Sequence, residues 1–284
     1  MNGSVYMLLA VGLFAGMDAL VKMLGPHYPT AQIIVCRSAF AFLPLAAAVR
    51  LSGGIAALRT KRAGYHIARG LLGLFSMAAF FMALPRMRLA DVIAISFSGP
   101  LFIVLLAGAV LGERIGAARW LAVFAGFGGV VLVVRPGTSV FDAVSLLPLA
   151  GALSYSSIML LVRRLGAREN VVATAFFFTA VTTVTSAIVA PFVWVPPDAF
   201  GWLLLTGTGL AGGTANLCLT QAFRSAPVSD LAPLEYTSLL WGLALGYMFW
   251  GEIPDTTALV GSAVIVASGL AVVPRSRLRA PELA

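Results

Sequence analysis

The sequence is poor in the residues on which most enzyme sites depend. It has two histidines, His27 and His66, and two lysines, Lys22 and Lys61. A P-loop needs a lysine after Gly-x-x-x-x-Gly, and neither lysine has that context, so ATP hydrolysis by this chain alone is not expected. A His-Glu-x-x-His zinc site and a Gly-x-Ser-x-Gly nucleophile elbow are also absent from the sequence. We therefore expect no metal, no cofactor and no hydrolytic chemistry.

Cysteine and charge are scarce as well. Cys36 and Cys218 lie far apart, each inside an apolar run, and this favours packing over a disulfide or a metal site. Charged residues make up 11% of the chain, against about 25% in an average soluble domain. The net charge of +8 comes from basic residues in short connections between apolar runs, so we expect no nucleic-acid partner.

Apolar residues are abundant instead. They form 60% of the chain, and the mean hydropathy is +0.97. A bilayer requires about 20 apolar residues per spanning helix, and runs of this length follow one another almost without pause. We predict an all-α polytopic membrane protein with ten transmembrane helices and the lipid bilayer around it. The predicted spans are Val5–Leu24, Ala31–Val49, Ile67–Leu84, Ala90–Leu111, Ala117–Val134, Val144–Val162, Val171–Val193, Phe200–Gln221, Leu231–Trp250 and Thr257–Val273.

Basic residues alternate between the connections. Most of them fall on the connections that share a side with the N-terminus, and the positive-inside rule then places both termini in the cytoplasm. The connection after the second span contributes Arg50, Arg59, Lys61, Arg62 and Arg69 to this set. The first apolar run lacks the basic start and the cleavage site of a signal peptide, so it is predicted to be the first span.

A long stretch of the first half recurs in the second. Ala90–Glu113 aligns without a gap with Ser229–Glu252, and both copies begin near an aspartate and end on Gly-Glu. Five spans per copy is an odd number, so the second copy must enter the membrane from the opposite side. We predict two inverted five-helix repeats, residues 1–137 and 138–284, with a shared site near the midplane. Glu113 and Glu252 then look like markers of helix ends.

Several ionisable residues lie inside predicted spans, where each needs a physical reason. Asp18 either pairs with Lys22 four residues later or lines the outer mouth of a cavity. Arg37 either binds backbone carbonyls or draws an anionic group inward. Glu235 is either favoured by the helix dipole at the start of its span, or receives a substrate ammonium or a coupling proton.

Other polar and aromatic residues are candidates for the cavity wall. Asn216 and Tyr155 either form interhelical hydrogen bonds or face the substrate. Phe97 and Tyr236 occupy matched positions of the two copies, which favours a shared wall over simple packing. The predicted substrate-binding residues are Asp18, Phe80, Phe97, Ser98, Tyr155, Asn216, Glu235, Tyr236 and Trp241.

Residues of both halves carry a family resemblance. They are Asp91, Phe97, Pro100-Leu101, Gly112-Glu113-Arg114, Arg119-Trp120, Gly126-Phe127, Gly129-Val130, Arg135-Pro136-Gly137, Ala232-Pro233-Leu234-Glu235-Tyr236, Trp241, Gly246 and Gly251-Glu252. On these residues the chain resembles the EamA family of the drug/metabolite transporter superfamily. The resemblance implies a ten-helix bundle of two inverted halves and solute transport by alternating access. Pro100 has no counterpart at Leu239, and Pro233 has none at Ala94, so the helix breaks of the two halves need not match.

The resemblance extends to function. Members include exporters of amino acids, among them aromatic ones, and carriers of other metabolites. We therefore expect a monomeric secondary transporter of the bacterial inner membrane that exports small amphipathic metabolites, with amino acids as the leading substrates. One alternative is an uptake carrier for a nucleoside-like or vitamin-like metabolite. The other is a lipid-modifying enzyme that uses Asp18, Arg37 or Glu235.

Overall fold

The computed structural model describes residues 2–51, 54–60, 62–112, 115–137, 142–165 and 171–272, and every regular element within them is a helix. The first elements are α1 (Gly3–Leu24), α2 (Thr30–Leu51), the 3-10 helix η1 (Gly54–Leu58), α3 (Ala63–Ala83), α4 (Leu89–Ser96), α5 (Gly99–Leu111) and α6 (Ala117–Val134). They are followed by η2 (Ala143–Ser145), α7 (Leu146–Leu165), α8 (Val171–Val189), η3 (Ala190–Val193), α9 (Ala199–Ser225), α10 (Val228–Glu235), α11 (Thr237–Trp250) and α12 (Thr256–Val272).

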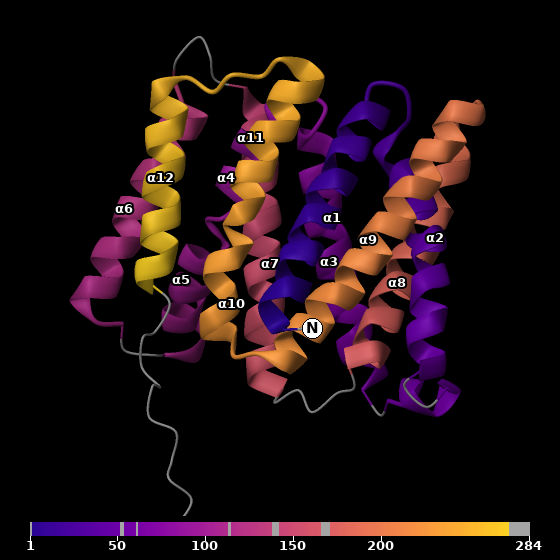
Figure 1. Cartoon of the computed structure of the whole chain (residues 1–284). Helices are drawn as coiled ribbons and strands as arrows, with labels where there is room; N and C mark the ends of the chain where they lie inside the picture. The colour runs from indigo at the N-terminus through magenta and orange to yellow at the C-terminus, as the bar shows by residue number, and fades with distance from the viewer. Residues whose placement is uncertain are drawn as a thin grey trace, which may run out of the picture.

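The helices stand side by side in one bundle (Figure 1). We call the end at which α1 ends and α12 begins the Glu252 face, which lies at the top of Figure 1. The opposite end, at which α1 begins, is the N-terminal face. Helices far apart in the sequence pack along one another: α1 lies along α9, α3 along α7, and α6 along α12.

Small residues permit the closest of these contacts. A Cβ atom on Gly129 of α6 would lie 2.7 Å from the carbonyl oxygen of Gly261 on α12, and a Cβ on Gly261 would lie 2.7 Å from the carbonyl oxygen of Gly129. The two backbones therefore touch at this point. Such contacts matter in a bilayer, where burial of apolar surface gives helices no advantage over contact with lipid.

Seven helical stretches of the described residues are long and apolar enough to cross a membrane. They are Gly3–Leu24, Thr30–Arg50, Ala63–Ala83, Leu89–Leu111, Ala117–Val134, Ala143–Leu161 and Val172–Val193, and Thr256–Val272 is a shorter apolar helix. The fold is therefore that of an all-helical polytopic membrane protein. The count of ten spans and the inverted relation of the halves stay predictions.

Two of the predicted spans are interrupted near their middle. Phe97 and Ser98 separate α4 from α5, and Tyr236 separates α10 from α11. These are the residues that the alignment of the two copies pairs, although the prolines near them do not match. The breaks therefore fall at aligned positions, although the prolines differ and the first break is two residues long and the second is one residue long.

The two interruptions have different local causes. Pro100 has no N–H to donate to the carbonyl of Ser96, so the first span loses a helical hydrogen bond at its break. In the second span the Thr237 hydroxyl donates to the Leu234 carbonyl at 2.6 Å and competes with the backbone there. Different residues thus produce the same local change of helix geometry.

A buried ion pair joins three elements at the Glu252 face. Lys22 of α1 contacts the Glu252 carboxylate and donates to the Met87 carbonyl at 2.5 Å. The other Glu252 oxygen accepts the N–H of Leu89, at the start of α4, at 2.9 Å. The Lys22 ammonium also lies 5.0 Å from the centre of the Trp250 ring. Lys22 is 5% exposed and Glu252 16%, so the pair ties α1, α4 and α11 together away from solvent.

This arrangement changes two interpretations of the sequence. Lys22 pairs with Glu252, and no ion pair joins it to Asp18 among the described residues. Glu252 does mark a helix end, because its N–H donates to the Gly246 carbonyl at 3.1 Å, but its carboxylate also links distant helices. Glu113, its counterpart in the first copy, lies outside the described residues.

A more exposed set of charges lies on the same face. Arg88 binds Asp91 at 2.7 Å and lies 3.6 Å from Asp255, which Arg135 also contacts. The N–H of Ala258 donates to the Asp255 carboxylate at 2.9 Å. That hydrogen bond, followed by the Arg135 guanidinium, lowers the pKa of Asp255 below its usual value.

We predict that Glu252→Gln lowers the free energy of unfolding by about 3 kcal/mol, because it leaves the Lys22 ammonium buried without its carboxylate. Equilibrium unfolding in mixed detergent micelles measures this loss. Asp255→Asn is the matched control on the same face, and its cost should be much smaller because the Asp255 side chain is 45% exposed. Equal losses for the two variants would contradict the role given to Glu252.

Candidate substrate site

The two helix interruptions meet in the interior of the bundle. The rings of Phe97 and Tyr236 lie with their centroids 4.5 Å apart and their planes tilted by 34°. They come from the breaks of two different spans, and α4 packs against α11 at this level. Irregular backbone at membrane depth is tolerated where protein or an aqueous cavity surrounds it, and interrupted helices often form the binding sites of transporters.

Other predicted aromatic residues surround this pair. Phe80 of α3 and Phe97 pack against the same buried cluster of apolar side chains. Trp241 of α11 faces α1, where its ring lies 3.7 Å from the position of a Cβ on Gly12. Trp241 remains 45% exposed, so its indole is available to a ligand as well as to α1.

Tyr155 of α7 lies beside the first of the two breaks. The residue is 50% exposed. Its ring lies 3.9 Å from the position of a Cβ on Gly99, the first residue after the break in the fourth span. Tyr155 therefore lies near one break, and Glu235 directly precedes Tyr236 at the other.

Arg69 lies in a different place from the one that the sequence pattern predicts. The pattern of basic residues assigns Arg69 to the cytoplasmic connection after the second span, whereas the structure places it inside α3. The signal was available, because Arg69 follows the predicted start of its span at Ile67. The positive-inside rule instead led to the assignment of Arg69 to the connection before this span.

Asp18 belongs to a different cluster, nearer the Glu252 face. It is buried on α1, next to Met17, and Arg37 is buried on α2. Gly212 of α9 makes room for the arginine, since a Cβ there would lie 3.0 Å from a terminal guanidinium nitrogen and 2.6 Å from the Met17 sulfur. Within the part of the chain that the structure describes, no hydrogen bond, ion pair or ring contact joins Asp18 to Phe97 or Tyr236, so the structure does not group it with them.

The two remaining candidate residues, Ser98 and Asn216, differ in how exposed their side chains are. Ser98 is fully enclosed, and its hydroxyl has no hydrogen-bond partner among the described residues. Its carbonyl accepts the N–H groups of Leu101 and Phe102 at 3.0 and 3.2 Å, which restarts the helix after the break. Asn216 is partly exposed on α9 and forms no hydrogen bond with described residues.

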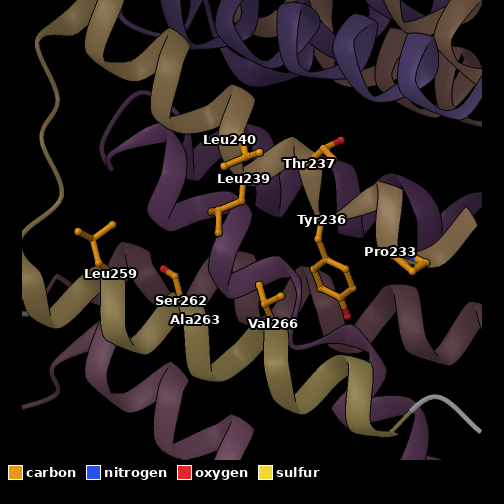
Figure 2. A pocket seen from close by; sticks show the side chains of 9 residues that line it. All are labelled: Pro233, Tyr236, Thr237, Leu239, Leu240, Leu259, Ser262, Ala263 and Val266. Atoms are coloured by element: carbon orange, nitrogen blue, oxygen red, sulfur yellow. The ribbon is translucent and has the colours of Figure 1, made fainter. Parts of the chain in front are cut away.

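A separate apolar groove of about 380 Å³ lies between α10–α11 and α12 (Figure 2). Tyr236 borders it, and its hydroxyl points along α12, where a Cβ on Gly269 would lie 2.4 Å away. The remaining lining residues are Pro233, Thr237, Leu239, Leu240, Leu259, Ser262, Ala263 and Val266. Leu240 and Leu259 are 65% and 46% exposed, so the groove opens at the outside of the bundle and is distinct from the cluster around Tyr155.

Comparison with known proteins identifies the family of the chain. The sequence pattern of the EamA-like transporter family matches residues 1–135 and 143–273. The chain belongs to the EamA-like transporter family. Its curated relatives are transporters as well, so this EamA-family chain is a membrane transporter and not an enzyme.

Three relatives illustrate the range of the family. The pseudopaline exporter CntI of Pseudomonas aeruginosa is 28% identical over 275 residues, which cover 95% of each chain. An S-adenosylmethionine uptake transporter of Rickettsia prowazekii is 28% identical over 273 residues, or 96% of this chain and 92% of the relative. A riboflavin transporter of Vibrio cholerae is 26% identical over 272 residues, or 94% and 91%. Their named substrates differ widely.

One solved structure shares the fold. A crystal structure described only as that of a protein superposes with a TM-score of 0.66, covering 95% of this chain and 96% of that one. Its sequence is 22% identical, so this likeness speaks for the fold alone.

We predict that Tyr236→Ala lowers transport at least tenfold while changing thermal stability no more than Tyr247→Ala does. A contact between two aromatic rings contributes about 0.5–1.5 kcal/mol. The substitution should remove the contact of Tyr236 with the substrate as well as its contact with Phe97. Tyr247 is the matched control, because it lies on α11 and is 64% exposed. Uptake into liposomes and thermal unfolding of both variants are the measurements. Parallel loss of stability and transport in Tyr236→Ala would assign this residue to packing alone.

Proposed function

We propose that this EamA-family chain is a secondary transporter that exports small amphipathic metabolites, with amino acids, including aromatic ones, as its leading substrates. The observation that carries the proposal is the meeting of Phe97 and Tyr236 at the two helix breaks, with the carboxylate residue Glu235 directly before Tyr236 in the chain. An aromatic wall next to a charged side chain suits a molecule with an apolar part and a charged end.

The same proposal includes two inverted five-helix repeats, residues 1–137 and 138–284, with ten spans in total. Three observations support it. The helix breaks fall at aligned residues, the contact of α1 with α9 has its counterpart in that of α3 with α7, and the family pattern matches the two halves in separate ranges. In this arrangement α9, the α10–α11 pair and α12 complete the spans of the second repeat.

Alternating access requires that one end of the bundle open while the other is closed. At the Glu252 face, Lys22 and Glu252 hold α1, α4 and α11 together, as a closed gate would. If both termini lie in the cytoplasm of a bacterial cell, this face is the outer side of the inner membrane. Opening it then requires that Lys22 and Glu252 separate.

A second candidate function is uptake of a nucleoside-like or vitamin-like metabolite. The observation that favours it is the similarity to transporters named for S-adenosylmethionine uptake and for riboflavin. The similarity to a pseudopaline exporter favours the export direction equally. We expect the transporter to work as a monomer in either case.

We predict that purified protein in liposomes accelerates counterflow of labelled amino acids, with phenylalanine, tyrosine and tryptophan faster than alanine. An aromatic side chain gains contact with the Phe97–Tyr236 pair, and alanine does not. The panel includes riboflavin and S-adenosylmethionine to test the uptake candidate. If no amino acid moves faster than in protein-free liposomes under any imposed gradient, amino-acid transport by this chain is refuted.

We also predict that single cysteines introduced beside Gly112 and Gly251 react with impermeant maleimide from opposite sides of the membrane. Cys36 and Cys218 are replaced by serine or alanine beforehand. An odd number of spans per repeat requires this result, because it reverses the second copy. Labelling of both sites from the same side would refute the inverted relation.

A further inference from the structure

The groove between the α10–α11 pair and α12 is long and straight. Residues three and four positions apart on α12 form one of its walls, and such residues share one face of a helix. They are Leu259, Ser262, Ala263 and Val266. At about 1.5 Å per residue, this wall extends along about 10 Å of α12, from about 5 Å to about 15 Å after the start of the helix. The groove therefore runs along the helix axes.

The direction and depth of the groove relate it to the bilayer. The helices stand side by side, so a groove along their axes is parallel to the hydrocarbon chains of the surrounding lipids (Figure 1). Because α12 begins at the Glu252 face, the groove lies in the half of the membrane nearest that face. Leu240 and Leu259 are exposed at its rim, so the groove opens sideways to lipid.

The lining of the groove contains hydroxyl groups but no charge among its nine residues. The Thr237 hydroxyl already donates to the Leu234 carbonyl at 2.6 Å. The Tyr236 hydroxyl lies against α12, where a Cβ on Gly269 would be 2.4 Å away, and Ser262 is buried. Polar ligands need precisely placed charged or hydrogen-bonding groups, and this lining is suited to hydrocarbon instead.

A groove that opens into hydrocarbon is filled by what surrounds it, because side chains beside a void lose their dispersion contacts. Its volume is about 380 Å³. A helix about 10 Å wide fills about 800 Å³ over the same length, so a helix of a second copy could lie across the groove but not within it. The sequence after Val272 contains Arg275, Arg277 and Arg279, which are costly in hydrocarbon. A lipid chain is the remaining occupant.

We propose that this groove binds one hydrocarbon chain of a membrane phospholipid. The chain lies lengthwise between α11 and α12 and enters from the leaflet at the Glu252 face. Tyr236 contacts this chain as well as Phe97, so the lipid packs against one residue of the helix break. The inference goes beyond the proposed function, and it stands whether or not amino acids are transported.

A chain in the groove is held more firmly than the other lipids around the protein. Leu239 and Tyr236 point into the groove from one side, and Ser262 and Val266 point into it from α12 (Figure 2). A lipid beside α6 touches one helix face only, where Leu121 and Phe124 are 70% and 67% exposed. The lipid in the groove should therefore remain bound when the others are washed away.

The test uses a phosphatidylcholine that carries a photoreactive diazirine in one hydrocarbon chain. The full chain is reconstituted in vesicles of phosphatidylethanolamine and phosphatidylglycerol with a trace of this probe, extracted in mild detergent, washed and irradiated. Mass spectrometry of peptides then locates the adducts. We expect about tenfold more adduct on the groove residues than on Leu121 and Phe124, because the enclosed chain makes more contacts. A probe with the diazirine in its headgroup should leave no adduct in the groove.

A matched pair of variants tests the position of the chain. Ala263→Phe places a ring in the groove, and it should lower the groove adducts about tenfold by excluding the chain. Ala267→Phe is the control, because Ala267 is also exposed on α12 but does not line the groove. Its adducts should equal those of the parent protein. Equal labelling of the two variants would show that the groove is not the binding site.

A second pair covers the case in which Ala263→Phe does not fold, which thermal unfolding reveals. Leu259→Trp narrows the groove at its end nearest the Glu252 face, and Val260→Trp alters the next residue, which lies outside the lining. The two positions are matched in exposure, at 46% and 49%. Leu259→Trp should lose groove adducts and Val260→Trp should keep them. Adducts spread equally over α6 and the groove, or absent from both after washing, would overturn the proposal.

Discussion

The need to pair every polar group inside hydrocarbon governs this structure. Backbone groups meet it through helices, which account for every regular element of the described residues. Where a helix is interrupted, at Phe97 and at Tyr236, the ring at one break packs against the ring at the other. Local hydrogen bonds, such as that of Thr237 to the Leu234 carbonyl, bind the freed backbone groups.

The charged side chains meet the same requirement in different ways. Lys22 and Glu252 are paired and buried, and they hold distant helices together at one face. Arg88, Asp91, Arg135 and Asp255 form a more exposed set of contacts on the same face. The buried pair therefore explains how helices distant in the sequence are joined at this end of the bundle.

Much of the fold could be predicted from the sequence, because length and apolarity decide which segments cross a bilayer. The alignment of the two copies also pairs Phe97 with Tyr236, and the structure shows these two rings in contact. The partners of charged residues were harder to find. Local spacing suggested Lys22 with Asp18, whereas the partner of Lys22 lies in the second half of the chain. Long-range pairs of this kind leave no local pattern in the sequence.

The central claim is that an amino acid binds beside the aromatic pair at the helix breaks. The most direct measurement is an experimental structure of the protein in lipid nanodiscs with L-phenylalanine bound, determined by electron cryomicroscopy. The account predicts ligand density in contact with both Phe97 and Tyr236. Ligand density confined to the groove between α11 and α12, or to the region of Asp18 and Arg37, would contradict it.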